Sequence, residues 1–455
     1  NYSLQLTHSE NWRLDLHDLN IQQGEMHAQL PGLVLARNLA DDLGWWFGAD
    51  YLALQDVLPV ARELLAVLDR PWPASLPQQI SGSLADFDLM FDAQSRQRWL
   101  SGEFRDLAVR EWPKRPSLSG LNGNIRLLAG EGQLNLNAPA LLVDWPEMFG
   151  YPLQLSLPEC QAEVVLGAAW QLALHACHLF NNDVSAQGDV RIAASPGRPA
   201  VDVNVEILRL DATRLNPYWP QGIMPARVTS WLRSNLHEGQ VSSGRLQIFG
   251  DMDDWPFRNG KGRFEARAQI ENGVLSFVPG WPKLQQLTAT AEFIGSGMRV
   301  EGHAADFAGV PVAAAEARIE NFGQPRLMVE FSGQDQVGKV LNLLQQTPVL
   351  PAREVDLSRF SFTGTVAAQG VLDIPLGKTP GELQLDGNAR LSKGGFVDRA
   401  SETQLDGVAG KLKFDQRHLW AENLAAHYKG KPAKLDLQAG GDDLWGLRAR
   451  LKGEF

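Results

Sequence analysis

The stretch FEARAQIENGVLSFVPGWPKLQQLTATAEFIGSGMRVEGHAADFAGVP, residues 264–311, decides the fold of this 455-residue chain. Moved by 121 positions, it aligns without a gap with a weaker copy of itself, in which Phe264 falls on Leu385 and Phe293 on Phe414. The copies share apolar residues at alternate positions and turn residues, while their polar residues differ. A catalytic site would repeat its polar residues, so the repeat indicates a structural surface.

Apolar and polar residues alternate within this stretch. The apolar positions are Phe264, Ala266, Ala268 and Ile270, followed by Leu287, Ala289, Ala291 and Phe293. Successive side chains of a β-strand point to opposite faces, so each predicted strand has one apolar and one polar face. The dipeptide Asn272-Gly273 follows the first run and predicts a hairpin turn.

The same alternation occurs on both sides of this stretch. The further apolar positions are Val201, Val203, Val205, Ile207, Leu327, Val329, Phe331, Leu385, Leu391, Leu412 and Phe414. We expect these residues and those named above to line one apolar face.

Three stretches have the apolar spacing of a helix: residues 54–68, 226–239 and 336–345. Pro59 falls in the first turn of the first helix, where its missing N–H is harmless, and we expect Gly239 to cap the second. Few other segments have the length of a helix that crosses between parallel strands, so antiparallel strands are expected.

Each predicted helix precedes a fresh set of strands, which suggests a modular chain. We divide it into a β-meander (1–53), a helix with a β-meander groove unit (54–224), and two helix-plus-groove repeats (225–334 and 335–455).

A long meander with one apolar face must bury that face against a second sheet, inside a closed barrel, or inside its own curl. Sandwiches and barrels usually close within roughly 100–250 residues, whereas this repeat continues in one direction, as in a solenoid. We therefore predict a mainly β fold: a long curled antiparallel sheet that forms an open groove, with about three short α-helices. Stacked sandwiches are the alternative.

The charge balance excludes several partners. Lys and Arg total 42 and Asp and Glu total 53, a formal charge of −11 without a basic block. Nucleic acid and anionic membrane surfaces both require clustered positive charge.

The sequence contains no run of about 18 apolar residues, so no segment of it is predicted to span a bilayer. The first residues have the pattern of a strand rather than a signal peptide. We expect a piece of a longer protein.

An open apolar interior suits lipid acyl chains. Each CH₂ removed from water contributes roughly 0.8 kcal/mol, so a sixteen-carbon tail favours such a groove by on the order of 10 kcal/mol. Equivalent apolar positions on every strand would let the lipid slide. The alternatives are a non-enzymatic envelope scaffold and a carbohydrate-binding β-solenoid that uses tryptophans as platforms. A hydrolase is disfavoured because the chain has no nucleophile elbow, His-x-x-x-His pair or phosphate loop. We expect no catalytic residue and no cofactor.

The two cysteines allow two interpretations. Cys160 and Cys177, with His175 and His178, fit no standard zinc spacing, and we expect no metal site. A disulfide would suit an oxidising compartment, but strict alternation places the two cysteines on opposite faces. Whether they are bonded stays open.

Two groups of acidic residues could be functional sites, but each has a simpler structural explanation. Asp251, Asp253 and Asp254 lack the glycine and distal Glu of a calcium loop, so we expect a solvated turn. The other group, Glu25, Asp41, Asp42 and Asp50, could supply the acid pair of a glycosidase, but such an enzyme needs two carboxylates in one cleft, which a sequence does not show. The neighbouring Trp45-Trp46-Phe47 cluster could contact lipid or a partner, although packing around the first helix is the simpler explanation.

The segment Asn216–Phe293 resembles the YhdP branch of the AsmA-like proteins. The helix ending at Gly239, Trp255-Pro256-Phe257 and Val278-Pro279-Gly280-Trp281-Pro282 carry the resemblance, and SLPQQISGSLADFDLMF after the first helix is also typical.

This resemblance implies a periplasmic part of an envelope protein of Gram-negative bacteria that an N-terminal helix anchors in the inner membrane. It implies a β-groove that carries phospholipids toward the outer membrane, with no catalytic motif to transfer. The partners implied are phospholipids and, through parts absent from this chain, both membranes. Other envelope proteins are possible partners, and nucleic acid is not one.

Overall fold

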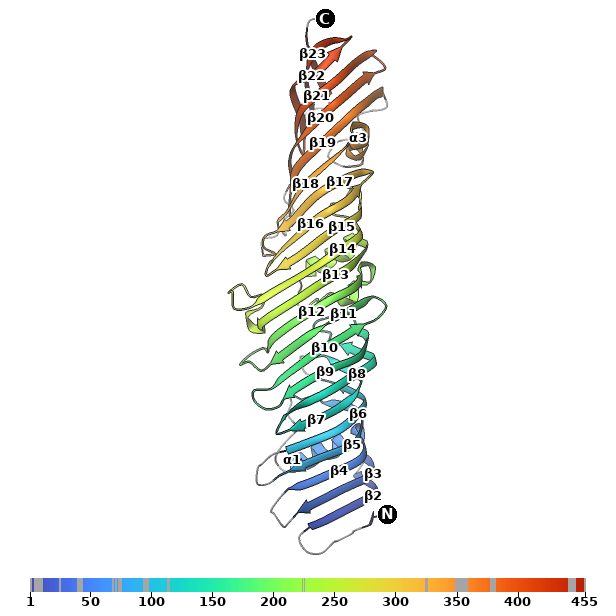
Figure 1. The fold of residues 1–455 in the computed structure, drawn as a ribbon, viewed down its shortest axis with the longest axis vertical. Helices are drawn as coiled ribbons and strands as arrows, with labels where there is room; N and C mark the ends of the chain where they lie inside the picture. The colour runs from blue at the N-terminus through green and yellow to red at the C-terminus, as the bar shows by residue number, and fades with distance from the viewer. Residues whose placement is uncertain are drawn as a thin grey trace. The chain divides into compact units, whose positions relative to one another are not determined.

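The computed structural model describes residues 2–3, 11–23, 26–38, 44–67, 69, 72, 76–92, 98–112, 115–222, 224, 226–323, 326–347, 359–376, 382–440 and 447–453. Contacts divide the chain into two units. Unit 1 comprises Asn1–Leu210, Arg214–Thr229 and Leu246–Arg263, and unit 2 comprises Asp211–Thr213, Ser230–Arg245 and Phe264–Phe455. Long strands dominate both units (Figure 1).

Unit 1 is an antiparallel meander in which each strand pairs with its neighbours in the sequence. Its elements are β1 (Tyr2–Ser3), β2 (Asn11–Gln23), β3 (Met26–Asn38), β4 (Trp45–Ala53), α1 (Leu54–Val67), β5 (Gln79–Phe91), β6 (Arg98–Arg110), β7 (Ser117–Leu128), β8 (Glu131–Asp144), β9 (Leu153–Val165), β10 (Gln171–Phe180), β11 (Val184–Ala193) and β12 (Ala200–Asp211). The units divide within α2 (Ala226–Asn235) and β13 (Leu236–Asp251).

Unit 2 repeats this plan. Its further elements are β14 (Arg263–Leu275), β15 (Leu284–Ile294), β16 (Gly297–Phe307), β17 (Val310–Ile319), β18 (Arg326–Gln336), α3 (Val337–Gln345), β19 (Phe360–Pro375), β20 (Gln384–Asp398), β21 (Thr403–Asp415), β22 (His418–Tyr428), β23 (Lys431–Gly440) and β24 (Leu447–Lys452). Short 3₁₀ turns lie at Ala212–Arg214, Asn216–Tyr218 and Met252–Asp254.

The predicted fold class is confirmed. The protein is mainly β, its strands are antiparallel, and the described residues include three α-helices. Among the described strands, no pairing joins the first and last strands of either unit, so neither sheet closes into a barrel. The four-part division of the chain remains a prediction.

The internal repeat is visible in the strand boundaries of unit 2. Both ends of β16 and both ends of β17 recur in β22 and β23 after 121 positions. The turn at Ala308-Gly309 likewise recurs at Lys429-Gly430, with positive φ at all four residues. The repeat therefore encodes the same hairpin geometry twice.

The predicted hairpin at Asn272-Gly273 is wrong. Asn272 has a φ of +53° inside β14, and the pairing with β15 passes from Ile270↔Ala289 to Gly273↔Leu287. This is a β-bulge, in which one strand gains an extra residue. Hairpin turns and bulges both need residues that tolerate positive φ, so the dipeptide alone does not distinguish them.

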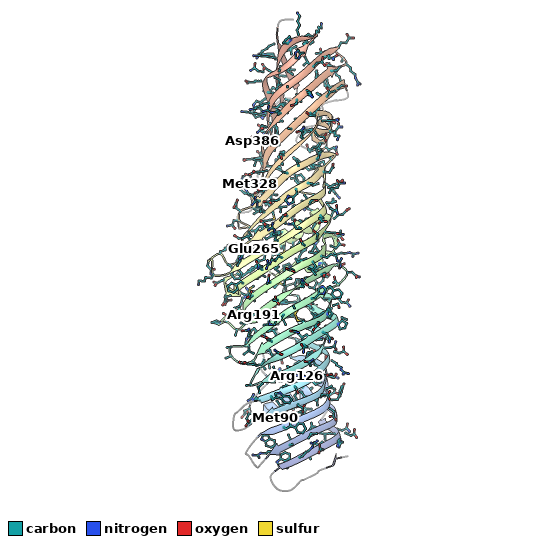
Figure 2. All side chains as sticks on the ribbon, in the orientation of Figure 1. Met90, Arg126, Arg191, Glu265, Met328 and Asp386 are labelled. Carbon is teal, nitrogen blue, oxygen red and sulfur yellow. A yellow bond between two sulfur atoms is a disulfide. The ribbon has the colours of Figure 1, made fainter. Side chains whose placement is uncertain are left out.

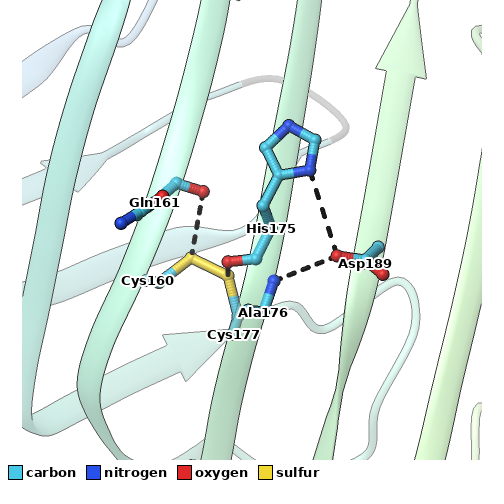
Figure 3. The surroundings of a disulfide bond; sticks show 6 residues. All are labelled: Cys160, Gln161, His175, Ala176, Cys177 and Asp189. Atoms are coloured by element: carbon cyan, nitrogen blue, oxygen red, sulfur yellow. Dashed lines mark hydrogen bonds and ion pairs between the residues drawn. A yellow bond between two sulfur atoms is a disulfide. The ribbon is translucent and has the colours of Figure 1, made fainter.

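The two cysteines lie on one face, contrary to the expectation from strict alternation. Cys160 on β9 and Cys177 on β10 form a disulfide (Figure 3). A bulge between Leu174 and Cys177 inserts one residue, with Ala176 at a φ of +51°, and so turns Cys177 to the face of Leu174. The Ala176 N–H donates to Asp189 Oδ1 at 3.0 Å, which secures the bulge.

The three helices lie where the apolar spacing predicts them, but some of them end at other residues than expected. The helix α2 ends at Asn235, and Gly239, which we expected to cap it, lies inside β13. A Cβ on Gly239 would lie 3.2 Å from Gly273 Cα, so the close approach of two backbones explains this glycine. Pro59, which we expected in the first turn of α1, is instead the sixth residue of this helix and lies inside it, where its missing N–H removes one helical hydrogen bond.

The apolar side chains of unit 2 cover one another. A buried cluster at its C-terminal end is formed by Ala389, Leu405, Val408, Leu412, Ala421, Leu424, Ala426 and Leu435. The helix α3 contacts β17, β18 and β19 rather than these strands. With no second layer over β20–β23 in the described part of the chain, such burial requires the sheet to curl toward its apolar face.

In unit 1, α1 contacts β3, β4 and β5. Its Val57 packs against the cluster formed by Ala49 and Leu52, which also includes Phe47 and Leu84. This helix therefore covers part of the apolar face of those strands.

Replacing Leu424 with Ala should lower the free energy of unfolding by about 2–5 kcal/mol, because Leu424 is 1% exposed and its removal leaves a cavity. Ile294→Ala is the control, since Ile294 is 59% exposed and its loss should change stability by no more than about 0.5 kcal/mol. Equal effects in chemical denaturation would contradict the assigned core.

Reduction of the Cys160–Cys177 disulfide should lower the free energy of unfolding by about 2–4 kcal/mol, because the bond closes a loop with a sequence separation of 17. Denaturation with and without a reductant measures this. A Cys160→Ala/Cys177→Ala variant should not respond to the reductant. Two reactive thiols in the denatured, unreduced protein would show that the bond is absent.

Candidate functional site

The pairing of β14 with β15 gathers the predicted lining residues of these strands on one face. The directly opposed pairs are Ala266↔Phe293, Ala268↔Ala291 and Ile270↔Ala289. Opposed residues of an antiparallel pair share a face, and Phe264 and Leu287 fall on that face by position. We call this surface, with its continuation on neighbouring strands, the apolar face.

The apolar face continues across unit 2 without interruption. One row of directly opposed residues is Ala268, Ala291, Val300, Ala317, Val329, Leu372 and Leu385. Leu327 and Phe331 flank Val329 on the same face, where they oppose Ile374 and Gly370. Leu412 and Phe414 oppose Ala389 and Gly387, and Leu391 opposes Gly410.

Unit 1 has an apolar face of the same kind. Val201, Val203, Val205 and Ile207 of β12 oppose Ile192, Val190, Gly188 and Ala186 of β11. Gly188 also opposes Cys177, so the disulfide lies on this face. The register therefore places each predicted lining residue on the apolar face of its own unit, while a role in holding lipid stays a prediction.

Glycines let aromatic rings lie flat on the apolar face. A Cβ on Gly387 would collide with the ring of Phe414, and one on Gly370 would come within 2.9 Å of Phe331 Cζ. Each ring belongs to the residue directly opposite its glycine. These glycines keep two strands close under a large apolar group.

The apolar face is covered unevenly. In β20–β23 many of its side chains are buried, with Leu385 and Leu412 each 8% exposed, while Leu391 and Phe414 are half-buried. In β14 and β18 the corresponding residues, including Ala268 and Val329, are only half-buried. The predicted lining residues therefore divide into a buried group, which also includes Leu287, Ala289 and Ala291 of β15, and a group that stays partly exposed.

The opposite face is polar and charged (Figure 2). It carries Arg126, Arg191, Glu265 and Asp386, each next to an apolar-face residue in its strand. Salt bridges join side chains across strands, and Arg299 lies 2.8 Å from Glu301 and 3.0 Å from Glu316. The hydrogen bond with Glu316 raises the pKa of Arg299.

A cavity of about 620 Å³ in unit 2 lies on the polar face. Glu301, Glu330 and Asp386 line it, and the apolar-face residue Phe331 is also part of its lining. The cavity therefore shares Phe331 with the predicted groove lining, and no sequence pattern indicated it.

An ion pair between a buried carboxylate and a partly exposed arginine fixes one edge of unit 2. Asp398 is 6% exposed and accepts two hydrogen bonds from Arg359, at 2.6 and 2.5 Å. These bonds lower the pKa of Asp398 below its ordinary value. The pair lies beside the stacked rings of Phe360 and Phe396, 5.4 Å apart. It therefore holds the start of β19 against the end of β20.

The other candidate residues have local structural partners. With both cysteines in a disulfide, neither is available as a metal ligand, and His175 lies 3.7 Å from Glu163 and 3.9 Å from Asp189. Among the described residues, no group of three or more His, Cys, Asp or Glu side chains could hold a metal ion.

The structure describes the acidic group Asp251, Asp253 and Asp254 in full, but only part of the group near Trp45 and Trp46. Asp251 caps the 3₁₀ turn by accepting the Asp253 N–H at 2.9 Å. Its carboxylate also accepts a hydrogen bond from the Ser195 hydroxyl. Trp46 Nε1 donates to Asp88 at 3.0 Å. Glu25, Asp41 and Asp42 lie outside the described residues.

A sequence model of the family described as "YhdP protein" matches residues 1–455. The intermembrane phospholipid transporter YhdP of Escherichia coli strain K12 is 22% identical over 388 residues, which cover 84% of this chain and 30% of that protein. This chain therefore matches less than a third of its curated relative's length. No solved structure matches it. None of the described helices is long and apolar enough to cross a bilayer.

Thiol labelling tests the uneven cover of the apolar face, because the disulfide leaves no native thiol to compete. A cysteine in place of half-buried Val329 should react with a maleimide much faster than one in place of Ala426, which is 2% exposed. Thr288→Cys, exposed on the polar face, is the positive control. Equal protection of Val329→Cys and Ala426→Cys would mean that the face is packed shut throughout.

Proposed function

Since this chain belongs to the YhdP family, we propose that its apolar face carries phospholipid acyl chains as a segment of an intermembrane lipid transporter. The observation that supports this is the uninterrupted row from Ala268 to Leu385, in which each apolar residue opposes another on the next strand. The named relative is an intermembrane phospholipid transporter. No catalytic step is part of the proposal.

The driving force is burial of the lipid tail. Each methylene that leaves water contributes roughly 0.8 kcal/mol, while the headgroup stays in solvent. Neighbouring strands offer nearly equal apolar surfaces, so a tail moves from one to the next without losing its contacts. Half-buried residues such as Val329 gain cover when a tail lies over them.

The setting of this transport is the periplasm, with the protein anchored in the inner membrane. The match covers 30% of the relative's length, so we assign membrane contacts to parts of the protein outside residues 1–455. The salt-bridged polar face of unit 2 suits an aqueous compartment.

Replacing Ala268 with Asp should abolish most lipid binding, because Ala268 is half-buried in the apolar row and an unpaired carboxylate there is costly to desolvate beside a tail. Phospholipid recovered in organic extracts of the purified chain, measured by mass spectrometry, should fall about ten-fold. Ala291 is less suitable, since it is 5% exposed and a charge there would disturb the fold.

Thr288→Asp is the matched control, because Thr288 is exposed on the polar face of the adjacent strand. Gln269 is a poorer control, since its Oε1 accepts a hydrogen bond from the buried Thr290 hydroxyl. Both variants should keep the wild-type circular dichroism spectrum. Normal lipid content in Ala268→Asp, or none in the wild-type chain, would leave an envelope scaffold or carbohydrate-binding protein as the better account.

A further inference from the structure

One edge of the sheet in unit 1, formed by the ends of neighbouring strands, carries a row of aromatic and cationic side chains. The directly opposed residues on β2 to β6 are Trp12, Arg37, Trp45, Phe91 and Arg98. The row lies at the strand ends, since β4 begins at Trp45, β5 ends at Phe91 and β6 begins at Arg98.

This row belongs to the apolar face. Two positions further along each strand lies a second row of opposed residues: Leu14, Leu35, Phe47, Leu89 and Leu100. Residues two apart in a strand share a face. Phe47 packs in the cluster with Val57 of α1, which identifies the face as the covered, apolar one. The two arginines therefore stand where the apolar face meets its edge.

Aromatic rings hold the two guanidinium groups. Arg37 Cζ lies 5.1 Å from the ring centroid of Trp45, and Arg98 Cζ lies 5.9 Å from that of Phe91. Trp12 packs edge-on against Trp45 at 5.5 Å. Contact with a ring face orients the planar guanidinium and leaves its N–H donors free for an anion.

Neither arginine forms an ion pair with a carboxylate of the described residues. Arg13, on the other face of β2, differs: its guanidinium lies over Trp46 and bonds Asp15 at 3.0 Å. An anion would thus complete the surroundings of Arg37 and Arg98 but not those of Arg13. Trp45 is 42% exposed and Arg98 is exposed, so the row is accessible.

We propose that Arg37 and Arg98 bind the phosphodiester group of a phospholipid whose tails lie on the neighbouring apolar row. A guanidinium donates paired hydrogen bonds to a phosphate, and the adjacent leucines and Phe47 offer the surface that a tail requires. The proposal rests on the function proposed above and adds a headgroup site to it. In the sequence, such a site is indicated by an arginine at the next alternate position after a run of apolar residues, as Arg37 follows Leu33 and Leu35.

Binding of two fluorescent lipids with identical acyl chains, a phosphatidylglycerol and a diacylglycerol, to the full chain tests the headgroup site. The wild-type chain should bind phosphatidylglycerol at least about ten-fold more tightly, because the diacylglycerol lacks the phosphate. Arg37→Gln/Arg98→Gln should remove this preference and leave diacylglycerol affinity unchanged. Arg37→Lys/Arg98→Lys should keep part of it and show that the edge still folds.

Arg13→Gln is the matched control, because it removes an aromatic-stacked arginine of the same edge from the opposite face. It should keep the full preference. Equal wild-type affinity for both lipids, or a preference that survives in Arg37→Gln/Arg98→Gln, overturns the site while transport stands. Binding of neither lipid overturns the proposed function itself. Displacement of bound phosphatidylglycerol by millimolar inorganic phosphate alone would show a free-anion site instead of a lipid site.

Discussion

The register between neighbouring strands is the constraint on which the rest of the structure depends. In each unit the apolar residues of a strand oppose apolar residues of the next, as in Ala268↔Ala291 and Val329↔Leu372. A slip by one residue would send a whole set of apolar side chains to the polar face. Because short helices are the only other layer among the described residues, the sheet must cover its own apolar side chains, and this produces the curl.

Bulges shift this register by one residue at defined positions. At three of them an N–H of the bulged strand donates to an Asn or Asp side chain on the next strand: Asp106 to Asn122, Ala176 to Asp189 and Asn423 to Asp436, at 2.9–3.0 Å. Each of these bulged residues has a positive φ. The bulge changes the phase of the alternation, and the neighbouring side chain satisfies the backbone group left out of the ladder.

The local part of this design was readable from the sequence. Alternation assigned a face to residues such as Val203 and Ala266, and the repeat anticipated two sets of equivalent strands. The features that alternation could not predict depend on residues that are distant in the sequence. The bulge that brings Cys177 to the face of Cys160 is secured by Asp189, and the edge row of Arg37 and Arg98 exists only once five strands are in register. The packing of Leu424, 1% exposed, also depends on how far the sheet curls.

The uneven cover of the apolar face connects the fold to the proposed transport. The buried cluster around Leu424 gives β20–β23 a packed core, which a lipid would have to displace. The half-buried residues of β14 and β18 leave surface that a tail can cover at no cost to the fold. In the proposed transport, the half-buried residues would contact the lipid tail, while the buried cluster stabilises the fold.

Photo-crosslinking with a phospholipid that carries a diazirine in its acyl chain tests the central claim most directly, because it reports which side chains the tail touches. Adducts mapped by mass spectrometry should fall on alternate residues of β14 and β18, at Ala266, Ala268, Val329 and Phe331. Adducts confined to the polar face, at positions such as Glu265 and Glu330, or an absence of adducts, would contradict it.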